Sequence, residues 1–175
     1  MNKVRRLILA VAVVLSLVAT ATALADSANF GTHLASRNEV PPNDSLAQGQ
    51  VNFKLSPDGT ELHYKLIAAN INNVFMAHIH MQKAGVNGPI VVWLFPSTAP
   101  VPGPAGVGRT DGVLAEGTIT AANLVGPLKG HPLSDLLAAI ESGNAYVNVH
   151  TKDSTVQVNT GPGNFPGGEI RGQLP

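Results

Sequence analysis

Apolar and polar residues alternate over several short stretches of the chain, with the two-residue period of a β-strand that buries one face. The alternation predicts strands at residues 30–34, 50–56, 62–66, 74–81, 117–120, 145–151 and 169–174, with a further short one at 156–158. Residues 90–95 are instead a continuous apolar run, short enough for a strand that is buried on both faces. The pattern therefore predicts a chain built mainly of short strands.

One segment follows the helical period. Leu133, Leu136, Leu137 and Ile140 recur at positions i, i+3, i+4 and i+7, which places them on one face of a helix. A proline before them suits a first helical turn, and Gly143 suits the left-handed position after the last turn. We predict a helix over residues 132–142. Many short strands and a single helix predict an all-β fold, a Greek-key-like antiparallel β-sandwich or barrel.

The composition changes in one long connection. Residues 96–112 contain four prolines and four glycines in 17 positions, which predicts a long surface loop, and loops of this length often carry function. Residues 161–168 are also rich in glycine and proline and are expected to form a loop.

The first 25 residues have the features of a secretory signal peptide. Lys3, Arg5 and Arg6 precede an uncharged apolar run at residues 7–19, and small residues at 23 and 25 suit cleavage after Ala25. The run is shorter than the roughly 20 apolar residues of a membrane-spanning helix, although an uncleaved anchor is the alternative. We predict a secreted or periplasmic protein, with residues 26–175 as the mature domain and no membrane attachment after cleavage.

Composition narrows the possible partners. The chain has no cysteine, so no disulfide stabilises it despite the predicted export. Removing three basic residues with the signal peptide leaves 8 basic against 11 acidic residues, a net charge of −3. No basic cluster survives, which argues against nucleic acid as a partner.

The most informative polar residues are three histidines. His78 and His80 are separated by one residue in a predicted strand, so both side chains project from the same face. Their Cα atoms are roughly 6.7 Å apart at the usual strand rise, which lets two imidazoles turn toward one point. His150 closes another predicted strand. If the three meet, they form a three-nitrogen site suited to copper or, as the weaker alternative, zinc. The other interpretation is that they hydrogen-bond loop backbone.

Other polar and aromatic residues carry weaker signals. His33, His63 and His131 are isolated, and we expect His63 to face solvent. Trp93 lies in the apolar run and is expected in the core. Glu169 and Arg171 are expected on one strand face, as a cross-strand ion pair or beside His150. Tyr146 and Asn148 share the face of His150 and can supply hydrogen bonds there.

Common enzyme motifs are not visible. Ser134 and Asp135 fall at the helix start rather than in a nucleophile elbow, and the glycine-rich loops lack the lysine of a phosphate-binding loop. We therefore predict no catalytic residues.

Five motifs resemble the CHRD domain family in order along residues 30–174. They are EVPP at 39–42, AHIH at 77–80, NGPIV at 87–91, YVNVHT at 146–151 and PGGEIRGQ at 166–173. The CHRD domain was first described as a repeated module in chordin, which binds growth-factor ligands, and it also occurs alone in exported microbial proteins. The resemblance implies an extracellular all-β module.

The histidines also resemble the copper ligands of copper–zinc superoxide dismutase, in which a His-x-His strand and a later Val-His strand bind copper on a Greek-key barrel. The bridging histidine, the zinc cluster and both disulfide cysteines of that family have no counterpart here. Glu169 stands where that family has an arginine near copper, and a carboxylate there would oppose superoxide, which argues against dismutase activity.

We predict two functions. The first is an extracellular or periplasmic binding module that recognises a protein or surface ligand through the 96–112 loop and the histidine face. The alternative is a copper-binding protein that uses His78, His80 and His150, with redox activity as a copper-dependent oxidoreductase if it is an enzyme. A structural matrix or surface protein is a third possibility.

Overall fold

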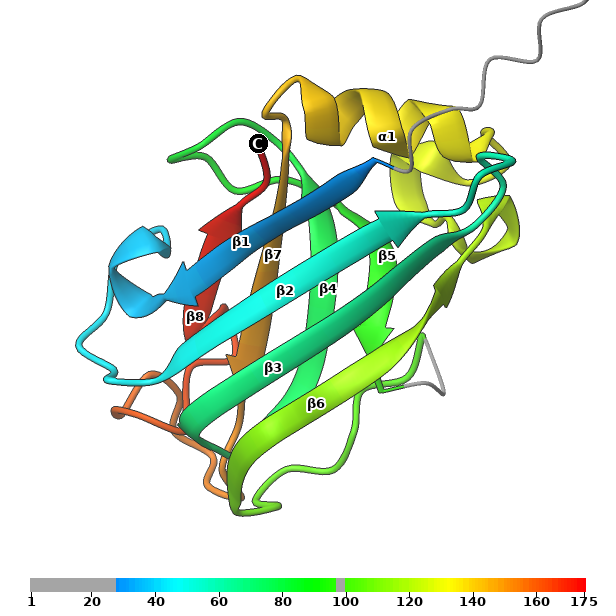
Figure 1. Cartoon of the computed structure of the whole chain (residues 1–175). Coiled ribbons are helices and arrows are strands. Elements are labelled where there is room, and N and C mark those ends of the chain that lie inside the picture. Colours follow the sequence, from blue (N-terminus) through cyan, green and yellow to red (C-terminus); the bar gives the residue numbers. More distant parts are fainter. Residues whose placement is uncertain (1–27, 97–99) are drawn as a thin grey trace, which may run out of the picture.

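The computed structural model describes residues 28–96 and 100–175. Eight strands form one antiparallel sheet that closes almost completely into a barrel, and a helix lies across one end (Figure 1). The strands are β1 (Asn29–Ala35), β2 (Gln48–Leu55), β3 (Leu62–Asn72), β4 (Val74–Met81), β5 (Ile90–Phe95), β6 (Arg109–Ile119), β7 (Ala145–Thr151) and β8 (Ile170–Gln173). The predicted all-β antiparallel fold with one short helix is confirmed. The signal peptide predicted for residues 1–25 lies outside the described residues.

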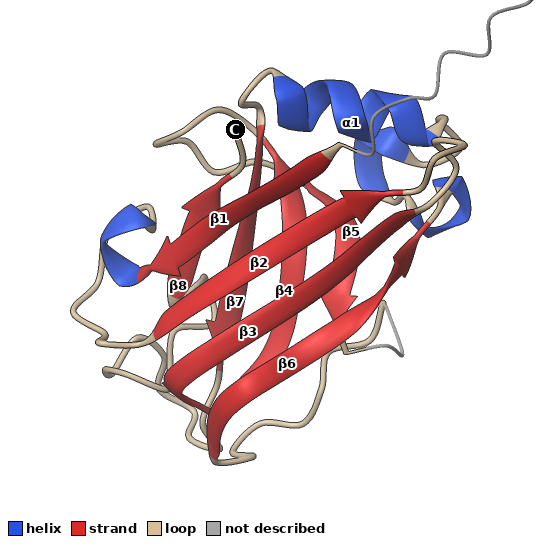
Figure 2. Ribbon diagram, in the orientation of Figure 1, coloured by secondary structure: helices blue, strands red, loops and turns tan. Residues whose placement is uncertain are grey.

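The strand order is β5-β4-β7-β8-β1-β2-β3-β6. Figure 2 shows β1, β2, β3 and β6 as one wall of the barrel and β8, β7, β4 and β5 as the other. The two end strands, β5 and β6, lie along the remaining seam. The Tyr64 hydroxyl of β3 donates a hydrogen bond of 2.8 Å to the Leu94 carbonyl of β5, so one side chain links the two walls there.

The hydrophobic core fills the inside of the barrel. Ala77 and Ile79 of β4 point inward beside Val147 and Val149 of β7, and all four are fully buried. Burying each valine or isoleucine side chain contributes about 1.5–3 kcal/mol relative to leaving it in water. Because successive strand residues point to opposite faces, the alternate residues of β4 and β7 must project from the outer face.

The helix α1 spans Leu133–Glu141, within one residue of the predicted 132–142 at each end. Its buried residues are Leu133, Leu136, Ala139 and Ile140, whereas Leu137 is half-buried. Three short 3-10 turns are also present: Ser36–Asn38, Ala121–Asn123 and Gly126–Leu128. Among the described residues, no helix is long and apolar enough to cross a membrane.

One strand prediction was too short, and another was wrong. The strand expected at 117–120 is the end of β6, which begins at Arg109 inside the expected 96–112 loop. Most of β6 is exposed, so it lacks the apolar alternation that marks a half-buried strand. Residues 156–158 form no strand, and Val156 is 99% exposed, because no neighbouring strand pairs with them.

Candidate metal centre

The three predicted histidines meet on the outer face of the barrel. His78 and His80 project from β4, and His150 projects from the neighbouring strand β7. The antiparallel register places His78 opposite Asn148, and His80 opposite Tyr146. All three histidines are nevertheless buried, with exposed fractions of 0% for His78, 7% for His80 and 5% for His150. Loops that fold over this part of the wall exclude solvent from them.

The ring nitrogens converge on one point. One nitrogen from each of His78, His80 and His150 lies within 4.8 Å of the other two. Nitrogens that bind one ion at 2.0–2.1 Å stand about 3–4 Å apart, so the rings need to approach by roughly 1 Å. The sequence prediction that these residues come together is confirmed.

Two backbone carbonyls fix which nitrogen faces inward. The Nδ1 of His80 is 2.9 Å from the Gly88 carbonyl, and the Nδ1 of His150 is 2.9 Å from the Pro166 carbonyl. A carbonyl oxygen only accepts, so both Nδ1 atoms carry the proton. The Nε2 of His80 therefore presents a lone pair to the cluster. The Nε2 of His150 does the same when the Asn148 amide, whose Oδ1 lies 2.9 Å away, is turned to offer its NH2 group instead. A hydrogen bond from the outer ring nitrogen to a carbonyl is the usual partner arrangement of metal-binding histidine.

Two buried ring nitrogens of these histidines have no protein partner in the described part of the chain. The buried Nε2 atoms of His78 and His80 make no hydrogen bond with described residues. The Nδ1 of His78 lies 3.1 Å from the Nε2 of His150. Since that Nε2 holds a lone pair, a proton on the Nδ1 of His78 joins the two rings, and a metal ion can take the place of this proton. The residues present thus fit a transition-metal ion.

The surroundings keep the imidazoles neutral. Burial lowers the pKa of His78 to about 2, helped by repulsion from His150 and His80. Burial also lowers the pKa of His150 to about 4 and shifts the pKa of His80 downward. Neutral imidazole is the form that binds metal, so the cluster is ready for a cation at neutral pH.

A layer of stacked side chains covers His80. The His80 ring stacks on Tyr146, with centroids 4.8 Å apart and planes 5° from parallel. The guanidinium of Arg171, from β8, lies 3.3 Å from the centroid of the Tyr146 ring. Arg171 also donates to the Val86 carbonyl at 2.9 Å and to the Asn87 side chain at 3.1 Å. These contacts tie the loop at residues 82–89 to the barrel wall over the site.

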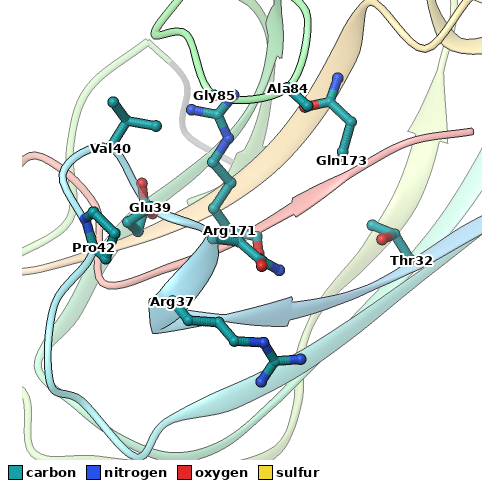
Figure 3. Close-up of a pocket in the computed structure, with 10 residues that line it drawn as sticks. Thr32, Arg37, Glu39, Val40, Pro42, Ala84, Gly85, Arg171 and Gln173 are labelled. Carbon is teal, nitrogen blue, oxygen red and sulfur yellow. The ribbon is translucent and has the colours of Figure 1, made fainter.

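A second covering segment is residues 39–42. The Asn87 side chain donates a hydrogen bond of 2.8 Å to the Val40 carbonyl and so joins this segment to the 82–89 loop. Glu39 is 4% exposed, and its carboxyl interacts with the Asn148 side chain. A cavity of about 630 Å³ opens on the outer side of this layer (Figure 3), lined in part by Arg37, Glu39 and Arg171.

Trp93 does not lie in the core as predicted. Its ring meets the His78 ring nearly at a right angle, with centroids 4.2 Å apart. It is only half-buried, because residue 93 of β5 points to the outer face while Val92 and Leu94 are buried. The single tryptophan of the chain therefore contacts a candidate ligand.

The predicted pairing of Glu169 with Arg171 or His150 was also wrong. Glu169 lies just before β8 and turns its buried carboxylate toward Thr151, which alternates with His150 on β7. Ser45 at 2.5 Å and the Gly163 amide at 2.8 Å also donate to it. The carboxylate thus lies on the other side of the wall from the histidines.

The remaining histidines stand apart from the cluster. His63 is exposed on β3, as predicted, and its Nδ1 is 2.9 Å from the Thr118 hydroxyl. His131 lies before α1 with its Nδ1 2.7 Å from Asp135, and His33 is exposed on β1.

The structure defines a class of antiparallel β-barrel proteins in which three imidazoles, buried against the outer wall, could hold a metal ion. Within that class, the chain belongs to the CHRD domain family, which it matches over residues 30–174. Neither the curated proteins nor the solved structures contain a significant match. The family resemblance carried by the five sequence motifs is confirmed, and the likeness to superoxide dismutase stays a prediction.

Proposed function

We propose that this CHRD domain protein binds a copper ion through His78, His80 and His150. The observation that carries the proposal is the arrangement of His80 and His150, whose outer nitrogens are held by backbone carbonyls while their inner nitrogens converge. For a given nitrogen site, copper(II) binds more tightly than the other divalent metals of its row. Copper is therefore favoured over zinc.

The burial of the site supports binding rather than turnover. Residues 39–42 and 82–89 cover the histidines. One hydrogen bond joins the two segments, and another ties the 82–89 loop to Arg171 of β8. A substrate would reach the ion only if these segments moved. A redox role is compatible with such a site, because an electron can pass without direct contact between substrate and metal.

The experiment is a copper titration of the metal-free protein that is monitored through the fluorescence of Trp93. Because Trp93 contacts His78, copper(II) in the cluster should quench its emission with an endpoint at one equivalent. Excess copper should also raise the melting temperature, since a ligand at a thousand times its Kd stabilises the fold by about 4 kcal/mol. His80→Ala should lose both effects, while His63→Ala, which removes an exposed histidine, should keep them. A His80→Ala protein that binds copper like the parent would refute the proposal.

A second candidate is the exported binding module predicted from the sequence. Exposed apolar side chains support it: Val101 and Val107 of one loop, and Val156 and Val158 of another. The two loops are joined by a hydrogen bond of 2.9 Å from the Gly106 amide to the Lys152 carbonyl. Exposed apolar groups in neighbouring loops are typical of interaction surfaces.

This second candidate requires export and a partner in the same compartment. The mature chain recovered outside the cytoplasm should begin at Asp26, which N-terminal mass spectrometry can read. Cross-linking in that compartment should yield a discrete product that Val101→Ser with Val156→Ser removes, while copper binding persists. Cross-linking that is unchanged in the double variant would refute this role.

A further inference from the structure

A buried carboxyl lies beside the histidine cluster and has no partner of opposite charge in contact with it. One oxygen of Glu39, Oε1, makes no hydrogen bond with described residues. The carboxyl packs against the Cα of Gly168, where a Cβ would overlap it. Figure 3 shows Glu39 on the segment that leads into Pro42, with the side chain of Arg171 from β8 next to it in the view and Arg37 extending away from both.

Asn148 connects this carboxyl to the candidate ligands. Its side-chain Oδ1 lies 2.9 Å from the Nε2 of His150, and the same side chain also interacts with His80. The same amide interacts with the Glu39 carboxyl. One amide thus separates Glu39 from two of the three imidazoles, which places the carboxyl next to the ligands without making it one of them.

The charges around the cluster make this position significant. Three neutral imidazoles contribute no negative charge to offset a cation, and an uncompensated buried charge is costly. Arg171 adds a positive charge on the same face. Among the described residues, the buried carboxylates are Glu39 and Glu169. Glu169 faces the opposite side of the wall, so Glu39 is the acidic group placed to balance an ion.

In the metal-free protein, the ionised form of the Glu39 carboxyl lacks a positive charge in contact with it. Burial raises the pKa of Glu39 to about 7, and the attraction of Arg171, the Val40 amide and Asn148 only partly offsets this effect. Within the described residues, no ion pair joins Glu39 to Arg171.

We propose that Glu39 is the counter-charge of the metal site, acting next to the ligands, and that it makes the site favour divalent over monovalent ions. The inference rests on the proposed copper binding and specifies its charge selectivity. Coulomb energy is proportional to the charge of the ion, so loss of the carboxylate should weaken copper(II) binding twice as much, on a logarithmic scale, as copper(I) binding.

The test compares the wild type with Glu39→Gln at pH 8, where the wild-type carboxyl is ionised. Dissociation constants for copper(II) and, without oxygen, for copper(I) are measured by competition with chelators. Partners next to the ligands typically change metal affinity 10–100-fold, so we expect that loss for copper(II) and about 3–10-fold for copper(I). Glutamine keeps the shape of the protonated carboxyl, so the variant should fold, and circular dichroism checks that it does.

Glu169→Gln is the matched control, since it removes the other buried carboxylate. It should leave the ratio of the two copper affinities unchanged, and exposed Glu116→Gln replaces it if the protein does not fold. Equal losses for both ions in Glu39→Gln, or no loss, would overturn the counter-charge role. A wild type that binds no copper would instead refute the proposed function, so the two failures are distinguishable.

Discussion

Histidine protonation couples the candidate site to the stability of the fold. His78 and His150 have ordinary pKa values near 6.5 in an unfolded chain, but burial holds them near 2 and 4 in the folded protein. The unfolded state therefore binds more protons than the folded state below pH 6.5, and stability must decrease on acidification through that range.

We expect the free energy of unfolding of the metal-free protein to fall between pH 6.5 and pH 4. Full protonation of His150 alone would cost about 3 kcal/mol. Glu39 acts in the opposite direction, because its raised pKa stabilises the fold below pH 4.5 and that contribution is lost as the pH rises toward 7. The two histidines together outweigh Glu39, so the free energy of unfolding decreases overall on acidification. Urea denaturation at several pH values measures this, with His63→Asn as a control that keeps the slope. A flat profile would contradict the proton linkage.

Only some residues of the site were predictable from the sequence. The spacing of His78 and His80 gives a two-residue period that places both on one face. The alternation over residues 145–151 likewise places His150 in a strand. Glu39 gives no such signal, because it lies in a segment without periodicity before two prolines. Its motif carried the family resemblance, but burial over the histidines depends on contacts with Asn148 and Gly168 from distant parts of the chain.

The strands and the helix were predictable where one face is buried. The predicted limits of β4 and β5 agree with the structure, because their apolar positions contact the core. Strand β6 was mostly missed, since its pairing with β3 is held by backbone hydrogen bonds while its side chains stay exposed. Its register also shifts in two places, and irregular pairing of this kind has no sequence period.

The helix α1 allows a matched test of packing. Leu136 is fully buried and Leu137 is half-buried, although both belong to the predicted apolar face. Leu136→Ala should lower the free energy of unfolding by about 2–5 kcal/mol, because it leaves a cavity in the core. Leu137→Ala should cost clearly less. Urea denaturation of the two variants measures the difference, and equal losses would mean that α1 packs differently from the structure described.

At the scale of the whole molecule, closure of the barrel depends on the seam between the two end strands of the sheet, β5 and β6. Without disulfides, closure comes from packing and from contacts such as the Tyr64 hydroxyl on the Leu94 carbonyl. No sequence pattern predicted this contact, because it joins β3 to a strand that is not its neighbour in the sheet.

We expect Tyr64→Phe to lower the free energy of unfolding by about 1 kcal/mol, the usual net value of one such hydrogen bond. Hydrogen exchange should also become faster in β5 and β6 than in β1 and β2, because the seam is the part that the variant loosens. Mass spectrometry of exchanged peptides would read both regions. Uniform acceleration across the sheet would argue against a specific role of the seam.

The histidines occupy the outside of a barrel wall whose inside is packed with aliphatic side chains. The wall therefore separates the packed core on its inner face from the candidate metal site on its outer face. Substitutions in the covering segments at residues 39–42 and 82–89 should therefore alter the site more than the packing of the core. The same barrel should accept other metal-binding side chains on that outer surface. Such changes would alter which ion binds while the hydrophobic core stays packed.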